Sequence, residues 1–250
     1  MRLTAMRTMP VVICTTVLAL GLAGCGTGSQ SMESATPDAA LFGDCKADDP
    51  ALGGATVIAE ADLEGSGAKN AIAYVARDID GPCANALFTT FDGEPSAISV
   101  ANTPLDADSA DVIQLSGTDR QLLMVREQAH PRGGYVVHLY GAADRRLGEV
   151  LADGEPVVGF EATDGGMPPA TAECTDDAGI ATVTTTTHKP PGIVLAWDVT
   201  RTTYSLDGNT AKQTSLKQIR TAAADPSLRK EMPQLFEPEG YFADCIVPSR

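Results

Sequence analysis

The stretch YVVHLY at residues 135–140 sets the expectation for the fold. Nearly every position in it is β-branched, aromatic or aliphatic, a composition typical of a strand. Successive side chains of a strand point to opposite faces of the sheet. We therefore expect Val137 and Leu139 on one face and His138 and Tyr140 on the other, with one face packed inward and the other partly wet.

Similar short runs follow one another along the chain, separated by Gly, Asp, Asn and Pro. Their spacing of roughly ten residues is typical of an all-β sandwich, barrel or propeller. The runs are Thr56–Ala61, Ala71–Ala76, Ala86–Phe91, Ala97–Ala101, Val112–Leu115, Leu122–Arg126, Leu147–Leu151, Val157–Ala162, Ile180–Thr187, Ile193–Leu206 and Ala211–Leu216. The sequence thus predicts a mainly-β domain of antiparallel sheets.

Turn signals suggest that this pattern repeats. Asp92-Gly93 and Asp207-Gly208 each follow an apolar run, and Asp-Gly supplies the positive φ angles of a tight hairpin. Tyr140-Gly141 likewise follows a predicted strand and precedes polar residues, so we expect a turn there too. We expect about three repeat units and an irregular or partial propeller-like fold, because a full propeller needs about four or more blades. The units are Ala55–Val100, Val112–Leu151 and Ile180–Leu216.

Two features of the later chain carry structural expectations. The run Thr182–Thr187 has threonine on both faces, which favours an exposed or edge strand over a central one. The lone Trp197 lies beside Leu195 and Val199. A tryptophan among aliphatic residues in a strand buries its ring more often than it stacks on a ligand, so we expect a packing role.

The C-terminal part changes character. Thr221–Phe236 carries Leu228, Met232 and Leu235 at helical spacing and predicts one short helix. Pro233 should break or shorten that helix. The apolar residues around Cys245 are expected to fold back onto the domain as a terminal segment. They are Tyr241, Phe242 and Ile246.

The N-terminus has the form of a secretory signal. Arg2 and Arg7 precede an apolar run, Val11–Leu22, and no acidic residue occurs before Glu33. A basic front, an apolar middle and small residues before a cleavage site are typical of such signals. The apolar run is shorter than the roughly 20 residues that a spanning helix needs, so a transmembrane anchor is disfavoured.

The signal ends in Leu22-Ala23-Gly24-Cys25, which resembles the bacterial lipobox. The resemblance implies cleavage before Cys25, a diacylglyceryl group on the Cys25 thiol and acylation of the new amino group. Two or three acyl chains anchor a protein stably, whereas one does so only marginally. We expect a mature protein held at the cell membrane, on its extracytoplasmic side.

This interpretation divides the chain into three parts. Residues 1–24 are the expected signal peptide, residues 25–40 a flexible tether rich in Gly, Ser, Thr and Ala, and residues 41–250 a single mainly-β extracytoplasmic domain. Loss of the signal removes two arginines and no acid, so the formal net charge changes from −15 to −17. The electrostatic field of a protein with this net negative charge repels phosphate backbones, so nucleic acid is an unfavourable partner.

Four cysteines are left once the signal with Cys14 has gone and Cys25 carries lipid. An even number in an oxidising compartment predicts two disulfides, although four cysteines allow three pairings. We favour Cys45 with Cys83 and Cys174 with Cys245, because each pair then brackets one end of the chain. No pair has C-x-x-C spacing, which disfavours a zinc site.

The stretch Asp62–Asn70, followed by an apolar run, resembles the D-x-D-G-D-G-x-x-D loop and strand of FG-GAP or VCBS repeats, the units of integrin-type β-propellers. In that family the loop commonly binds Ca²⁺ through oxygen ligands. The resemblance implies Asp62, Glu64, Ser66 and Asn70 as the ligand set. Three of the four differ in charge or length from the family pattern, which lowers the expected affinity. A Gly-rich acidic turn between two strands is the alternative.

Catalytic motifs are sparse. The three histidines, His130, His138 and His188, share no H-x-x-x-H spacing, and no G-x-S-x-G elbow is present. We therefore expect a non-catalytic binding or sensory module of the cell envelope, whose ligand would be a protein, a glycan or a small molecule. The alternatives are an envelope hydrolase with a site assembled only by folding and a purely structural spacer. A histidine beside an acid in a polar pocket would favour the hydrolase.

Overall fold

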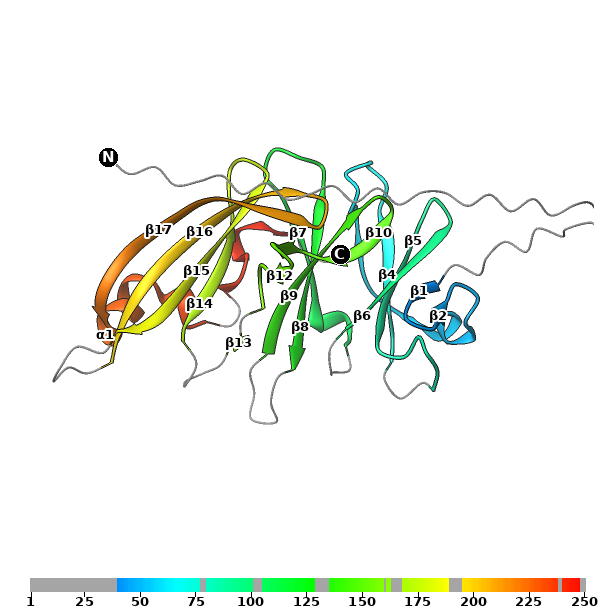
Figure 1. The fold of residues 1–250 in the computed structure, drawn as a ribbon, viewed down its shortest axis with the longest axis horizontal. Helices are drawn as coiled ribbons and strands as arrows, with labels where there is room; N and C mark the ends of the chain where they lie inside the picture. Colours follow the sequence, from blue (N-terminus) through cyan, green and yellow to red (C-terminus); the bar gives the residue numbers. More distant parts are fainter. Residues whose placement is uncertain are drawn as a thin grey trace, which may run out of the picture. The chain divides into compact units, whose positions relative to one another are not determined.

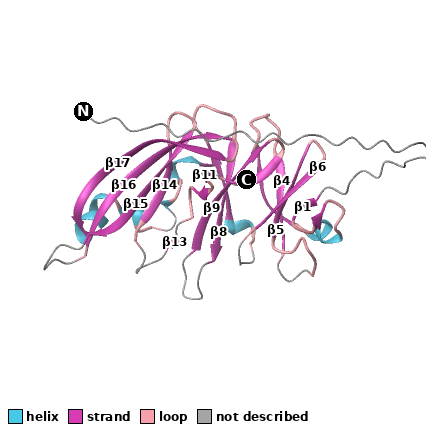
Figure 2. Cartoon of the chain, in the orientation of Figure 1, coloured by secondary structure: helices cyan, strands magenta, loops and turns pink. Residues whose placement is uncertain are grey.

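The computed structural model describes residues 40–76, 80–100, 105–128, 135–159, 161–162, 168–188, 195–237 and 240–247. These residues belong to one compact unit, residues 38–250. The described residues are mainly β-structure in antiparallel and mixed sheets, with a single short α-helix (Figure 2). The predicted fold class is thereby confirmed.

The first sheet is a four-stranded antiparallel meander. Its order is β3 (Thr56–Ala61), β4 (Asn70–Val75), β5 (Ala86–Phe91) and β6 (Glu94–Ser99). Phe91 pairs with Glu94, so the turn between them is Asp92-Gly93, with φ angles of 51° and 83°. Positive φ at both positions is typical of a type I′ hairpin, as the sequence predicted.

The second sheet repeats the meander. Its main strands are β7 (Ala110–Gln114), β8 (Gln121–Gln128), β9 (Tyr135–Ala143) and β10 (Arg146–Glu149). The short strand β13 (Glu161–Ala162) pairs with β9, and β18 (Ile246–Val247) pairs with β7.

The turn expected at Tyr140-Gly141 is wrong. Strand β9 continues through Gly141, and the hairpin closes on Asp144-Arg145, with φ angles of 49° and 61°. Gly141 lies within the strand, where a turn of the same chain passes close to its backbone. A Cβ atom at this position would come within 3.0 Å of the Gly208 carbonyl oxygen.

The third sheet contains the longest of the described strands, β16 and β17. Its main strands are β14 (Ala170–Cys174), β15 (Gly179–His188), β16 (Ala196–Asp207) and β17 (Thr210–Ala224), and Figure 1 shows β16 and β17 as long curved ribbons. The small strands β11 (Leu151–Ala152) and β12 (Glu155–Pro156) extend this sheet, with β11 parallel to β17 at one residue pair. Asp207 pairs with Thr210, so the turn predicted at Asp207-Gly208 lies one residue later, at Gly208-Asn209.

The three predicted repeat units fall in these three meanders, but the third, Ile180–Leu216, leaves out β14 and the last residues of β17. Each meander has four consecutive antiparallel strands, and Figure 1 shows the sheets in chain order. A four-stranded meander is the blade unit of a propeller, and a closed propeller has typically four to eight blades. The arrangement is consistent with a partial, propeller-like fold.

The second sheet is buried on both faces. Leu122 and Met124 of β8 lie in one hydrophobic core, together with Ile180 of the third sheet. Leu123 and Val125 lie in another core, against residues of the first sheet such as Ile72. The side chains of a strand alternate between faces. The apolar run Leu122–Val125 of β8 therefore packs against the third sheet on one face and against the first sheet on the other.

The run Thr182–Thr187 is central only in its first half. It lies in β15, where residues 182–184 pair with β14 on one side and β16 on the other, whereas residues 185–187 pair, among the described residues, with β16 alone. Thr182 and Thr185 are buried, and the Thr185 hydroxyl donates a 2.7 Å hydrogen bond to the Pro169 carbonyl. A satisfied hydroxyl and a buried methyl group let threonine occupy such a position. The expectation of an exposed or edge strand was therefore wrong for residues 182–184, whereas Thr186 and Thr187 are exposed as it predicted.

The chain after β17 covers one face of the third sheet. Helix α1 (Asp225–Glu231) is followed by a 3₁₀ turn at Pro233–Leu235. Leu228 and Leu235 pack on Trp197 of β16 in a small core, which agrees with the packing role expected of the tryptophan. The helix is shorter than the predicted Thr221–Phe236 because residues 221–224 belong to β17.

The C-terminal segment then joins the third sheet to the second. The Phe242 N–H donates to the Ala172 carbonyl of β14 at 2.7 Å, and β18 pairs with β7. A disulfide links Cys174 to Cys245 in the same region. At the other end, Cys45 of β2 (Cys45–Lys46) is bonded to Cys83, and both are fully buried. Strand β2 pairs with β1 (Ala40–Phe42). The disulfide pairing is the one that the sequence analysis favoured.

Candidate functional site

The loop predicted to bind calcium is closed by its own first residue. Asp62 is only 4% exposed, and its carboxylate accepts hydrogen bonds from the backbone N–H groups of Ser66, at 3.0 Å, and Gly67, at 2.6 Å. Gly65 and Gly67 have φ angles of 72° and 83°, which glycine adopts without strain. The loop conformation therefore depends on Asp62 as a backbone acceptor.

The same loop is fastened to the second sheet. The Asp62 N–H donates to Gln121 Oε1 at 2.8 Å, and the Gln121 N–H donates to the Asp62 carbonyl at 2.8 Å. The Asn70 side-chain amide donates to the Thr90 carbonyl at 2.7 Å, while Glu64 is partly exposed. Asp62 and Asn70 thus both have structural partners. Calcium binding stays a prediction.

His138 of β9 is paired with an acid. Its Nδ1 lies 2.7 Å from Glu149 Oε1 of β10, with the imidazole side chain 17% and the carboxylate side chain 23% exposed. Burial by itself would lower the pKa of His138. The Glu149 hydrogen bond, with the negative charges of Glu127 and Glu149, outweighs burial and raises that pKa above 6.5.

Tyr140 and Glu127 extend this polar group into the core. Both side chains are buried. Burial, followed by the charges of Glu127 and Glu149 and a hydrogen bond with Glu127, raises the pKa of Tyr140 far above its usual value of 10. The tyrosine is therefore neutral over the physiological pH range, whereas His138 is of the residue type that changes charge near neutrality.

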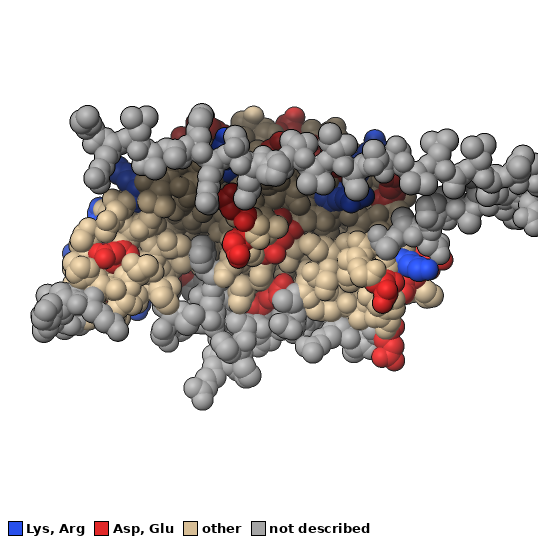
Figure 3. Space-filling view, viewed as in Figure 1, with Lys and Arg blue, Asp and Glu red and all other residues tan. Residues whose placement is uncertain are grey.

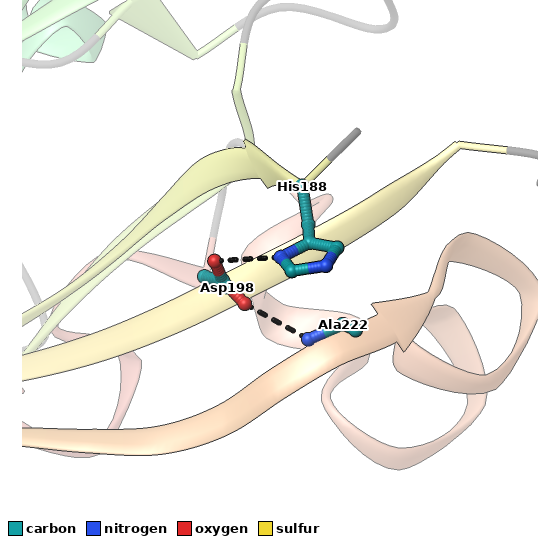
Figure 4. A network of polar contacts seen from close by, with 3 residues as sticks. All are labelled: His188, Asp198 and Ala222. Carbon is teal, nitrogen blue, oxygen red and sulfur yellow. Dashed lines mark hydrogen bonds and ion pairs between the residues drawn. The ribbon is translucent and has the colours of Figure 1, made fainter. Parts of the chain in front are cut away.

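His188 forms a second pair with an acid, on the third sheet (Figure 4). Its Nδ1 lies 3.0 Å from Asp198 Oδ2, and the other carboxylate oxygen accepts the Ala222 N–H at 2.8 Å. Ala222 has a positive φ of 50° at a register shift of β17, between the paired residues Arg220 and Ala223. The hydrogen bond from His188, followed by that from Ala222, lowers the pKa of Asp198. Asp198 thus secures the bulge and orients the imidazole.

The two histidine–acid pairs lie on different sheets and do not share a site. An acid that orients an imidazole is one half of a hydrolase triad. The other half is a nucleophile. Among the described residues, no serine, threonine or cysteine side chain hydrogen-bonds to either ring, and no three His, Cys, Asp or Glu side chains are grouped to hold a metal. His130 and Cys25 lie outside the described residues.

The surface of β17 was missed by the sequence analysis. Most of its side chains are exposed, including the large apolar Leu216 at 64%. Its basic residues lie opposite odd-numbered residues of β16 and so share one face. The pairs are Lys212 with Ser205, Lys217 with Arg201 and Arg220 with Val199. In Figure 3 carboxylates are frequent in the middle of the visible face, and basic groups occur in the middle and at both ends, including the end where β17 lies. The signal was an acid-free stretch, residues 208–224, in an acidic chain.

Comparison with known proteins identifies no relatives: no family model, curated protein or solved structure matches the chain. Within the described residues, no helix is both long and apolar enough to cross a bilayer.

Proposed function

We propose that this protein is a lipid-anchored lipoprotein of the cell envelope and that its β domain is a non-catalytic binding or sensory module on the extracytoplasmic side. The observation that carries the proposal is the sequence Leu22-Ala23-Gly24-Cys25 behind a basic front and an apolar run. The residues after the expected cleavage site would be tethered through Cys25.

The disulfides support an exported location. Cys45–Cys83 and Cys174–Cys245 close buried parts of the domain, and such bonds persist in oxidising compartments but are rare in the cytosol. The high negative charge supports anchoring by lipid over anchoring by a basic surface, because the net field repels anionic headgroups.

The binding role is supported by the third sheet. Its strand β17 presents exposed polar, basic and apolar side chains along fifteen residues. A surface of this kind suits a macromolecular partner because most side chains of this long strand are exposed to solvent. No feature of it supplies a reactive group.

The lipid anchor is tested by metabolic labelling with an alkynyl palmitate analogue in a bacterial host. We expect label on the wild-type protein and on Cys14→Ala, and none on Cys25→Ala. The Cys14 variant is the matched control, since that cysteine should leave with the signal peptide. Unlabelled wild type, or label on Cys25→Ala, would overturn the anchor. Crosslinking in intact cells would then identify the partner.

An envelope hydrolase is the second candidate, favoured by the 2.7 Å contact between His138 and Glu149. The imidazole of such a pair acts as a general base when a nucleophile lies within reach. A fluorophosphonate probe tests for a serine nucleophile. Covalent labelling of the wild type that is lost in His138→Gln would replace the non-catalytic proposal with this one.

A further inference from the structure

Strand β17 has a free backbone edge. On one side it pairs with β16 along its whole length, whereas on the other side β11 pairs with it only at Thr210. Among the residues that the structure describes, nothing else pairs with that outer edge. Unpaired N–H and C=O groups on an edge are a template for an added strand.

The edge is also positively charged. Lys212, Lys217 and Arg220 lie on one face of β17, and residues 208–224 contain no acid, in a chain whose formal net charge is −15. Arg220 forms an ion pair with Glu231 of α1, with 3.5 Å between Nε and Oε2. In the described part of the chain, Lys212 and Lys217 make no ion pair with an acid. The lysine charges are therefore available to a partner.

Arg201 and Lys217 are direct cross-strand neighbours. Like charges in directly opposite positions destabilise a sheet. Arg201 is compensated by Glu173 of β14, whose Oε1 accepts its Nε–H at 2.7 Å. Lys217 lacks such a compensation among the described residues, so a carboxylate placed beside it would relieve the repulsion.

Lysines and bulges also protect edges against unwanted pairing, and β17 has both. Its register shifts lie on either side of residues 215–218, which pair regularly with β16. Protection accounts for the lysines and bulges. It does not account for Leu216, a large apolar side chain left 64% exposed within that regular segment, because a protected edge avoids such a side chain.

We propose that the free edge of β17, centred on residues 211–218, binds an extended acidic polypeptide segment as an added antiparallel or parallel strand. The backbone edge would supply main-chain hydrogen bonds, Lys212 and Lys217 would pair with acidic side chains, and Leu216 would contact an apolar side chain on the opposite face. Anionic lipid would pair only with the lysine charges. A peptide would pair with the charges and also hydrogen-bond to the backbone edge. The inference deepens the binding function proposed above and rests on it.

The test is a titration of the full-length mature protein in detergent with a fluorescein-labelled peptide of alternating glutamate and threonine, followed by anisotropy. We expect saturable binding that weakens with salt. A peptide of the same sequence with alternate backbone nitrogens methylated keeps its charges but loses backbone hydrogen bonds. It should therefore bind at least about tenfold more weakly.

Two variants localise the site. Lys217→Glu should weaken binding of the acidic peptide about tenfold, whereas Arg146→Glu on β10 makes the same charge change away from the edge and should leave the affinity unchanged. Circular dichroism and the melting temperature show that both variants are folded.

Several results would overturn the inference. They are no binding of the acidic peptide, equal binding of the methylated peptide, equal weakening by both variants, or binding to vesicles of phosphatidylglycerol in place of the peptide. Failure of the lipid-labelling experiment is separate from these results: it would remove the anchor but leave the peptide titration unaffected.

Discussion

The indole Nε1–H of Trp197 donates a 2.9 Å hydrogen bond to Asp225 Oδ1, which joins β16 to the first turn of helix α1. The other carboxylate oxygen accepts the Arg229 Nε–H at 2.8 Å. Burial alone would raise the pKa of Asp225, but the two hydrogen bonds and the charge of Arg229 outweigh it and lower that pKa. One carboxylate thus secures the helix on the third sheet.

Replacement of this carboxylate should loosen the helix. We expect Asp225→Ala to lower the free energy of unfolding by about 1–2 kcal/mol, because the buried indole N–H loses its acceptor. Urea denaturation followed by the fluorescence of the only tryptophan measures the loss. The exposed Asp119 gives the control, and Asp119→Ala should change stability by less than about 0.5 kcal/mol. Equal effects of the two variants would contradict the role of Asp225.

The His138–Glu149 pair should make stability depend on pH. The folded-state pKa of His138 is raised above 6.5, so protonation favours the folded protein. Its contribution is complete below the unfolded-state pKa and is lost as the pH rises through the folded-state value. We expect the difference in melting temperature between the wild type and His138→Gln to be larger near about pH 5.5 than near about pH 8.5.

An NMR titration of the imidazole gives an independent measurement of the same effect. Glu149→Gln should lower the pKa of His138, because the hydrogen bond to a carboxylate and its charge are both removed. A stability difference that does not vary with pH, together with an unchanged imidazole pKa in Glu149→Gln, would rule out this coupling.

The Asp62 loop allows a structural role and a calcium role to be separated. Because the carboxylate accepts two backbone N–H groups, we expect Asp62→Ala to cost about 1–3 kcal/mol of stability in the presence of EGTA. Glu64→Ala should be nearly neutral under the same conditions, since the side chain is partly exposed.

Calcium then gives the second readout. A rise in the melting temperature of the wild type with Ca²⁺ that is absent from both variants would support the metal site. If the melting temperature does not respond to Ca²⁺, then Asp62, Glu64, Ser66 and Asn70 are not its ligands, and the loop is structural.

The disulfide Cys174–Cys245 should anchor the C-terminal segment. It closes a sequence separation of 71 residues. We expect the double alanine variant to lose about 2–5 kcal/mol of stability. Hydrogen exchange at the Phe242 amide, which donates to the Ala172 carbonyl, should become faster in this variant. Unchanged protection would mean that packing alone holds the segment.

Local patterns predicted much of the fold. The strands, the three units and the short helix near Leu228 followed from alternation, turn residues and spacing, because these act over a few residues. The hairpin at Asp144-Arg145 was missed because Arg145, unlike Asp144, is not a usual choice for positive φ. The burial of Thr185 was missed because its hydroxyl partner, the Pro169 carbonyl, is distant in sequence.

The sequence by itself determined the mainly-β class, the meandering units and the expected signal, since each is written in contiguous residues. Only the tertiary structure decided which groups meet. It paired His138 with Glu149 and His188 with Asp198. It let the Asp62 carboxylate accept hydrogen bonds from the backbone of its own loop. It also placed Lys217 opposite Arg201, on a strand with a free edge. Those outcomes depend on strand register and sheet order, which arise from burial summed over many distant residues and from no single local pattern.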